Sequence, residues 1–286
     1  MAIAFLGAGM MGAGMVEAAL ARGEQVTVWN RTLEKARPLT EKGARLATTP
    51  AEAAAGAERV HIMLSDDGVV DGALEPAAPG IGREALVIDH TTTSPAGTAA
   101  RAAACEARGV GFLHAPVFMS PAMCRDAKGL MLCAGPKARF DRAEPALAKM
   151  TGQVWWVGER SDLAASYKLF GNAMLITICG GLADVFSMAA HLGIPPADAL
   201  GLFAKFNPAG VIQARGSWMA KGQFSPASFE LSMARKDVRL MLESAGDLPL
   251  SALPGIAARM DALLAEGRGA EDLAVLAADA IGKGGG

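Results

Sequence analysis

The sequence predicts an α/β fold, with a doubly wound and mostly parallel sheet, followed by an all-helical domain. In the first half, apolar segments with strand character alternate with helical segments, which is typical of parallel sheets whose strands are joined by helices. After Gly158 no strand pattern is present, and a long helical run leads into several shorter ones. We therefore expect one domain over residues 1–160 and an all-helical domain over residues 161–286, joined by the long helix.

Length, composition and charge narrow the class of protein. The chain has 286 residues, 51% of them apolar, and a formal net charge of −2, so it can bury a sizeable core. The near-neutral charge gives no electrostatic reason to expect nucleic acid or a membrane surface as a partner. The cysteines show no CxxC spacing, no secretory leader is evident, and the nearest candidate for a membrane span, residues 169–183, is short. We expect a cytoplasmic protein with reduced thiols and no bound metal.

A glycine-rich turn follows the first predicted strand, residues 2–6. It reads Gly7-Ala8-Gly9-Met10-Met11-Gly12 and leads into a helical run and a second strand, residues 26–30. Gly7 permits the tight turn, Gly9 lets the backbone approach a pyrophosphate, and Gly12 permits close packing of helix on strand. The N–H groups at the start of the helix bind phosphate. Strand, turn, helix and strand in this order predict a Rossmann-type dinucleotide site, with all six residues of the turn in contact with the cofactor.

The end of the second strand bears on the choice between NAD and NADP. An NAD site usually carries an acidic residue here to bind the ribose 2′-hydroxyl, whereas this chain has Asn30, Arg31 and Thr32. A guanidinium and a hydroxyl suit a 2′-phosphate, so we expect NADP as the cofactor. The alternative is that Arg31 is an ordinary solvated charge, and the use of NAD stays open.

Further polar residues follow the later predicted strands, which cover residues 59–64, 85–93, 110–117, 129–135 and 153–158. Ligands of doubly wound sheets lie beyond the carboxyl ends of the strands. Leu64 and Ser65 at one strand end, Thr91 and Thr92 at the next, and the segment 118–121 are therefore expected to line the nicotinamide side. The alternative for each serine or threonine is a helix cap.

A lysine and an asparagine share one face of the predicted long helix, which runs for about thirty residues from a cap at Ser161 to a stop at Gly193. Lys168 and Asn172 stand at positions i and i+4 in an apolar setting. Desolvation lowers the pKa of a lysine and so favours proton exchange near neutral pH, and the amide of Asn172 can bind substrate or orient the lysine. The alternative is a lysine that snorkels to water.

Four segments in order resemble motifs of the β-hydroxyacid dehydrogenase family, which includes 3-hydroxyisobutyrate dehydrogenase and tartronate semialdehyde reductase and is related to 6-phosphogluconate dehydrogenase. The segments read FLGAGMMGAGM, DHTTTSP, YKLFGN and FELSMARKDVRL and span nearly the whole chain. The resemblance implies that Lys168 is the catalytic acid/base, that Asn172 binds substrate, and that Thr92 lies at the nicotinamide. It also implies that Lys236 lines the site near nicotinamide and substrate, with Asp237 in support.

The chain departs from this family in the loop that reads APVSGG in its members. Here the text is APVFMSPAMCRDAKG, so that Ser120 is the matching serine and Pro121-Ala122 replace the two glycines. Proline lacks an N–H and alanine restricts close approach of the backbone, which weakens the expected carboxylate site. Gly171 takes the place of the first asparagine of the lysine motif. Phe118, Met119 and Met123 would make the pocket more apolar, or they pack on the helical domain.

The resemblance implies reversible hydride transfer between a short β-hydroxyacid and its semialdehyde with NADP. Lys168 would accept the hydroxyl proton in oxidation and return it in reduction. Two alternatives stay open. One is an imine reductase with an apolar cleft. The segment APVF resembles the loop of those enzymes, although they typically carry Asp or Tyr in place of Lys168. The other is a cofactor-binding module without catalysis. The long apolar helix predicts a homodimer or homotetramer.

Overall fold

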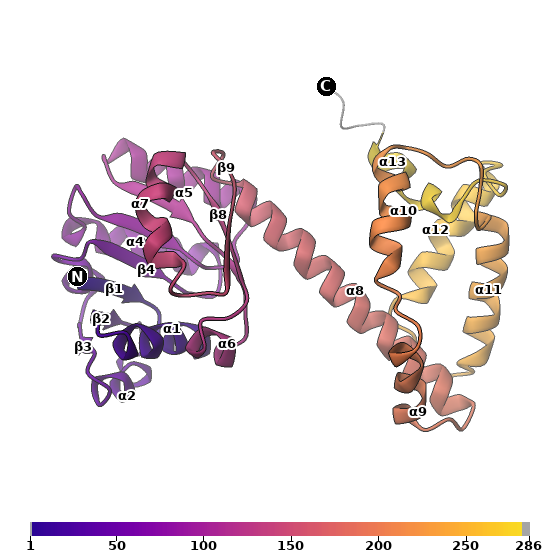
Figure 1. The fold of residues 1–286 in the computed structure, drawn as a ribbon, viewed down its shortest axis with the longest axis horizontal. Coiled ribbons are helices and arrows are strands. Elements are labelled where there is room, and N and C mark those ends of the chain that lie inside the picture. The colour runs from indigo at the N-terminus through magenta and orange to yellow at the C-terminus, as the bar shows by residue number, and fades with distance from the viewer. Residues whose placement is uncertain (1, 282–286) are drawn as a thin grey trace. The chain divides into compact units, whose positions relative to one another are not determined.

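A computed structural model describes residues 2–281, which form two compact units (Figure 1). The first unit ends at Asn172 and the second begins at Ala173. This boundary lies inside helix α8, Leu163–His191, whereas the sequence analysis placed it at residues 160/161, before the helix. The reason is local packing, because Ala164 and Lys168 are buried in the first unit at the start of α8.

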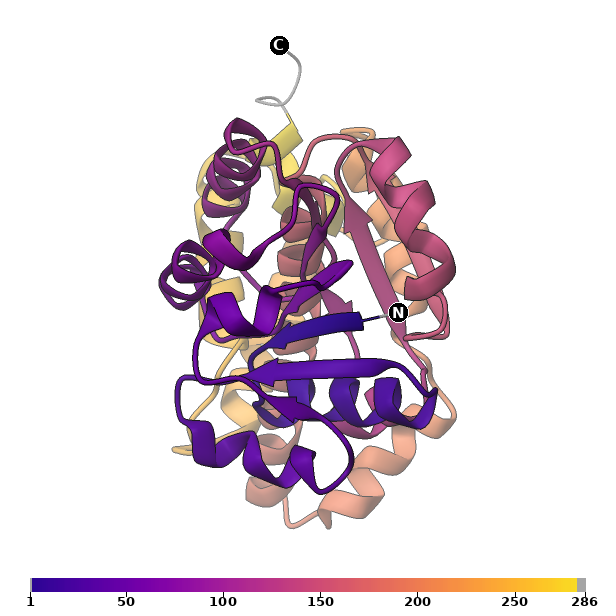
Figure 2. The same cartoon turned by 90° about the vertical axis from the view of Figure 1, so that its left-hand side faces the viewer.

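The first unit contains a nine-stranded sheet that is mostly parallel, and the mostly parallel arrangement is as predicted. The strands are β1 (Ala2–Leu6), β2 (Gln25–Trp29), β3 (Arg45–Leu46), β4 (Arg59–Ile62), β5 (Leu86–Asp89), β6 (Gly111–His114), β7 (Val117–Phe118), β8 (Leu130–Ala134) and β9 (Gln153–Gly158). Their order is β3-β2-β1-β4-β5-β6-β8-β7, and β9 pairs with β8. From β3 to β6 every pairing is parallel, and β8 runs antiparallel to β6 and β7. Figure 2 shows β1 and β2 side by side. The sequence analysis missed β3 and β7, because two-residue strands are too short to show an alternating pattern.

Helices cover both faces of this sheet. They are α1 (Met10–Ala21), α2 (Arg37–Thr40), α3 (Pro50–Ala54), α4 (Asp67–Ala77), α5 (Pro95–Ala107), α6 (Pro121–Arg125) and α7 (Lys137–Leu147). Successive side chains of a strand point to opposite faces. Accordingly, Ile3 and Phe5 of β1 join one buried core with residues of α1, whereas Ala4 and Leu6 join another with residues of α4. This double cover leaves the strand ends as the accessible parts of the sheet.

In the second unit, the regular secondary structure of the described residues, 173–281, is helical, and one isolated β-bridge joins Glu230 and Asp272. After α8 come α9 (Pro196–Gly201), α10 (Gly210–Ala220), α11 (Leu231–Ser244), α12 (Leu253–Ala265) and α13 (Ala278–Ile281). Leu231, Leu263 and Val275 are fully buried in its core. Asp184 of α8 is also buried and accepts hydrogen bonds from three backbone N–H groups at the start of α12, which anchors α8 in this unit.

Helix α8 has 29 residues, and Gly193 follows it with a φ of +70°, so the predicted long helix and its glycine stop are confirmed. By length and composition alone, the helix is long and apolar enough to cross a membrane, since an 18-residue window of it has a mean hydropathy of 1.7. One such helix is weak evidence of a membrane span, because the core helix of a water-soluble protein passes the same test. The expectation that the protein has no membrane partner stays a prediction.

Candidate functional site

A pocket of about 500 Å³ opens at the carboxyl ends of β1, β2 and β4. This is where a doubly wound sheet binds a dinucleotide, at the point where the strand order reverses. Nine residues predicted to contact the cofactor line it: Gly9, Met10, Met11, Gly12, Asn30, Arg31, Thr32, Leu64 and Ser65. Gly7, Ala8 and Thr92 lie outside this lining. Seven residues that the sequence analysis did not single out also line it: Trp29, Lys35, Met63, Gly68, Val69, Gly72 and Ala73.

The glycines of the turn differ in the space that a Cβ atom would find at each position. Gly7 has a φ of +116°, and a Cβ there would lie 2.1 Å from the carbonyl oxygen of Met63. A Cβ on Gly12 would lie 2.2 Å from the carbonyl oxygen of Gly7, so both glycines are required by the fold itself. By contrast, a Cβ on Gly9 would meet nothing within 4 Å, and no side chain caps the start of α1 behind it. Gly9 therefore leaves an open cradle with free N–H groups, which fits a pyrophosphate.

Two cations stand at the far end of this pocket. Arg31 and Lys35 both line it and are both exposed, and none of the lining residues is acidic. Asn30 holds the turn between them and the glycines, because its Oδ1 accepts from the N–H of Ala8 at 3.0 Å and its Nδ2 donates to the carbonyl of Thr32 at 2.7 Å. The signal that could have found Lys35 is its spacing of four residues from Arg31. This end of the pocket suits a phosphate better than a free ribose hydroxyl.

Some polar side chains after β4 and β5 make hydrogen bonds within the protein, and others do not. Thr91 is buried, and its Oγ1 accepts a hydrogen bond from the N–H of Leu64 at 3.1 Å, which ties the two strand ends together. Thr92 is exposed, and its hydroxyl makes no hydrogen bond among the residues described. Ser65 is also exposed and donates to Asp66 at 2.7 Å. Thr92 is thus the threonine with a hydroxyl free for a ligand.

Lys168 is 8% exposed although it carries an ammonium group. Its Nζ lies 3.9 Å from the centroid of the Phe118 ring, and no carboxylate in the described part of the first unit pairs with it. Burial lowers the pKa of Lys168 from its ordinary value. Asn172 stands one turn later on α8, is half-buried, and its amide makes no hydrogen bond within the described residues. A buried lysine with a lowered pKa beside a free amide is the arrangement that proton transfer to a bound substrate needs.

The loop after β7 folds into the short helix α6, which the sequence analysis did not predict. Ser120 caps this helix, because its Oγ accepts from the N–H of Met123 at 3.2 Å, so the serine expected to bind substrate already serves the backbone. The helix packs on α1, where a Cβ on Gly14 would lie 3.0 Å from the carbonyl oxygen of Pro121. The loop therefore places a turn of helix against the cofactor-binding helix α1.

Lys236, the remaining residue that was expected in the site, belongs to α11 in the second unit. Its Nζ lies 2.9 Å from Oδ1 of Asp237, and both side chains are largely exposed. Its place at the nicotinamide stays a prediction.

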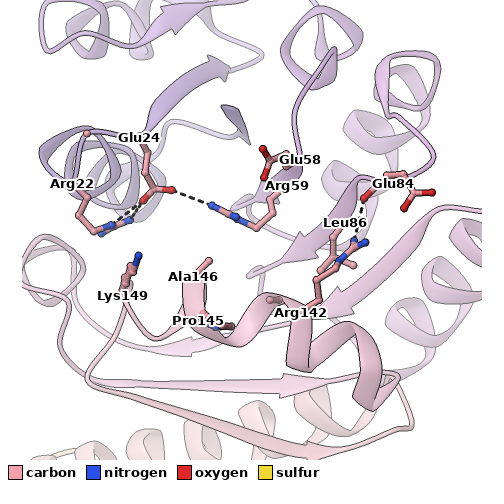
Figure 3. Close-up of a pocket in the computed structure, with 12 residues that line it drawn as sticks. Arg22, Glu24, Glu58, Arg59, Glu84, Leu86, Arg142, Pro145, Ala146 and Lys149 are labelled. Atoms are coloured by element: carbon pink, nitrogen blue, oxygen red, sulfur yellow. Dashed lines mark hydrogen bonds and ion pairs between the residues drawn. The ribbon is translucent and has the colours of Figure 1, made fainter. Parts of the chain in front are cut away.

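A second hollow, of about 490 Å³, lies at the opposite edge of the sheet (Figure 3). Its residues stand at amino ends of strands, since Arg59 begins β4 and Glu24 precedes β2. Several of the charged groups there are bound within the scaffold. Glu24 pairs with Arg22 at 2.8 Å and with Arg59 at 3.1 Å, and Arg142 donates to the carbonyl of Glu84 at 3.1 Å. Ligands of such sheets bind at the carboxyl ends, so we assign this hollow to the ion pairs of the scaffold.

The chain is similar to known proteins over most of its length. Residues 2–158 match the family described as the NAD binding domain of 6-phosphogluconate dehydrogenase. The chain is 31% identical to the 3-sulfolactaldehyde reductase of Escherichia coli over 279 residues, which covers 95% of this chain and 93% of the relative. It is 32% identical to glyoxylate/succinic semialdehyde reductase 1 of Arabidopsis thaliana over 266 residues, covering 88% and 89%.

Among solved structures, an imine reductase from Myxococcus stipitatus in complex with NADP+ has the same fold. The TM-score is 0.88 at 20% identity, and the match covers 96% of this chain and 98% of that one. This likeness confirms the predicted plan of a nucleotide-binding domain and a helical domain. The family match and the sequence relatives show that the chain belongs to the β-hydroxyacid dehydrogenase family and is an oxidoreductase with an NAD-binding domain of the 6-phosphogluconate dehydrogenase type.

Proposed function

We propose that this protein is an NADP-dependent reductase of short aldehyde acids, which interconverts a β-hydroxyacid and its semialdehyde with Lys168 as the acid/base. The observation that carries the proposal is the buried ammonium of Lys168, which has a lowered pKa and no carboxylate partner in the described first unit. A lysine that is buried without an ion pair costs stability, so its presence there favours a role in chemistry. The sequence relatives are named as reductases of an anionic aldehyde and of semialdehydes, which supports the substrate class.

The lining of the pocket indicates which residues would hold each part of the cofactor. The open cradle at Gly9 and the uncapped start of α1 would hold the pyrophosphate, and Arg31 and Lys35 would bind the 2′-phosphate. The structural neighbour from Myxococcus stipitatus is described with NADP+, which agrees with this choice. When bound, the cofactor supplies the hydride chemistry at its nicotinamide ring. Thr92, with its free hydroxyl, would orient that ring.

The chain's own part in the reaction is to hold substrate and move a proton. In reduction, the ammonium of Lys168 donates its proton to the carbonyl oxygen as that oxygen becomes a hydroxyl. In oxidation, the neutral amine accepts the same proton. The amide of Asn172, one turn away on α8, would donate to a substrate oxygen and so fix its distance from Nζ. Reduction therefore needs the protonated lysine, and oxidation needs the neutral one.

A screen of turnover tests this function against its alternatives. Purified protein is assayed for oxidation of NADPH and of NADH with short aldehyde acids, with cyclic imines and with neutral aldehydes. We expect turnover with aldehyde acids and NADPH. Faster turnover with cyclic imines would show an imine reductase instead. Tight NADPH binding without turnover on any member of the panel would show a binding module.

We also propose that the protein assembles as a homodimer or a homotetramer. Seven large hydrophobic side chains along α8 are exposed in the single chain: Tyr167, Leu169, Phe170, Met174, Leu175, Ile176 and Ile178. Apolar side chains gathered on one helix are covered in most soluble proteins. Light scattering coupled to size-exclusion chromatography tests this, and a monomer at micromolar concentration would contradict it.

A further inference from the structure

Phe118 of β7 and Gly171 of α8 are in close contact, although they are far apart in the sequence. Phe118 ends β7, and its ring faces the Nζ of Lys168 at 3.9 Å from the centroid. Gly171 stands three residues after Lys168 on α8, on the same side of the helix. A Cβ at position 171 would lie 2.3 Å from Cζ and 2.7 Å from Cε1 of the Phe118 ring. The ring therefore occupies the space that any other side chain at position 171 would need.

A glycine inside a helix weakens the helix, because glycine loses more backbone entropy than any other residue. Gly171 has no positive φ that would require a glycine. What requires it here is the ring of Phe118, which could not otherwise lie beside α8. The glycine and the phenylalanine thus act as a pair that brings an aromatic face against the lysine.

The ring is the one partner that the described first unit offers to the ammonium of Lys168. Burial favours the neutral amine, and an aromatic face favours the charged form, because the negative face of the ring attracts a cation. The contact also limits the rotamers of a long and flexible side chain. Its effect is to hold Nζ in one place and to stabilise the proton on it.

We propose that Phe118 is a positioning residue that holds the ammonium of Lys168 on its ring face, and that Gly171 is required because it admits that ring. The inference rests on the proposed role of Lys168 as proton donor. It predicts a site prepared for reduction, since the ring favours the protonated lysine, which is the form that delivers a proton to a carbonyl oxygen.

The first test is the pH profile of kcat/KM for reduction in the variant Phe118→Leu. Leucine keeps the site apolar but removes the aromatic face, so the limb at which activity falls with rising pH should move about half a unit to one unit lower. Phe140→Leu is the matched control, because Phe140 is a buried ring beneath Lys137, away from the site. The proposal is overturned if Phe118→Leu leaves the limb unchanged or moves it higher.

The second test measures stability and does not depend on activity. Gly171→Ala should lower the melting temperature of the protein with Phe118, because the new Cβ collides with the ring. In a Phe118→Ala background the same change should be neutral or stabilising, because alanine is the better helix former. An equal effect in both backgrounds would overturn the proposed pairing.

These outcomes separate the two proposals. If Lys168→Met keeps its activity, the proposed function fails, whereas the coupling between positions 118 and 171 stands or falls on the melting temperatures. If Lys168→Met is inactive and Phe118→Leu leaves the pH limb in place, the positioning role alone fails.

Discussion

The cofactor pocket and the surroundings of Lys168 lie in the same unit but are built by different means. In the pocket, the decisive groups belong to the backbone: the open cradle at Gly9, the close approach of Gly12 to Gly7, and the uncapped start of α1. Around Lys168 the decisive contact joins two side-chain positions, Phe118 and Gly171, that are far apart in the sequence. A backbone site is encoded in one short motif, whereas a side-chain site depends on how distant segments meet.

The largest expected effect on the backbone site comes from Gly12→Ala. The new Cβ would lie 2.2 Å from the carbonyl oxygen of Gly7, so α1 must shift away from β1. Overpacking of this kind costs about 1–3 kcal/mol of stability, and the shift should abolish detectable NADPH binding. Gly9→Ala is the matched control, since a Cβ there meets no protein atom within 4 Å.

Thermal unfolding and fluorescence titration with NADPH separate the two glycines. Gly9→Ala should keep the melting temperature and weaken only the binding of NADPH. If Gly9→Ala binds NADPH as the wild type does, the cradle is not where the pyrophosphate lies.

A second prediction concerns three buried histidines of the first unit and the pH dependence of its stability. His61, His90 and His114 are fully buried, and burial lowers the pKa of His90 and of His114 to about 4 and that of His61 well below its usual range. His90 donates from Nδ1 to the carbonyl of Ala115 at 2.7 Å, and its Nε2 lies 3.0 Å from Nδ1 of His61, so both rings are neutral in this chain of bonds.

The folded protein therefore binds fewer protons than the unfolded chain between the unfolded pKa, near 6.5, and pH 4. Stability should be fully present above about pH 6.5 and fall as the pH decreases, by about 1 kcal/mol per histidine between pH 7 and pH 5.5. Urea titrations at a series of pH values measure this. His114→Asn should reduce the slope, and a flat profile over this range would contradict the neutral histidines.

A smaller effect is expected where the pocket meets the cofactor's 2′-phosphate. Arg31→Ala combined with Lys35→Ala removes two exposed cations, which should weaken the binding of NADPH about tenfold and leave the binding of NADH nearly unchanged. Lys149→Ala, an exposed lysine at the opposite edge of the sheet, serves as the control. Equal losses for the two cofactors would place the 2′-phosphate elsewhere.

These two regions also show how far the sequence could predict the structure. The turn from Gly7 to Gly12, the parallel strands and the long helix all follow from local patterns, and the structure confirms them. Lys168 and Asn172 could be paired because a helix fixes the spacing of i and i+4. The resemblance to the β-hydroxyacid dehydrogenase family is likewise confirmed.

What the sequence could not predict depends on tertiary contact. The ring of Phe118 reaches Lys168 only because β7 and α8 meet, and no local pattern encodes that meeting. The same holds for the chain of buried histidines, which forms because parallel strands place His61 beside His90. The cap that Ser120 makes on α6 was also not predicted, because α6 itself was not, and the expected role of Ser120 in binding substrate stays a prediction.

The most direct test of the account is single-turnover reduction by Lys168→Met with NADPH and the aldehyde acid that the screen identifies. Methionine keeps the length and apolar stem of the side chain but cannot donate a proton. We expect the rate of hydride transfer to fall by about 10²–10⁴ while the affinity for NADPH stays within twofold, since general acids usually contribute that much. Lys149→Met should behave as the wild type. A loss smaller than tenfold, with NADPH still bound, would contradict the claim that Lys168 carries the proton.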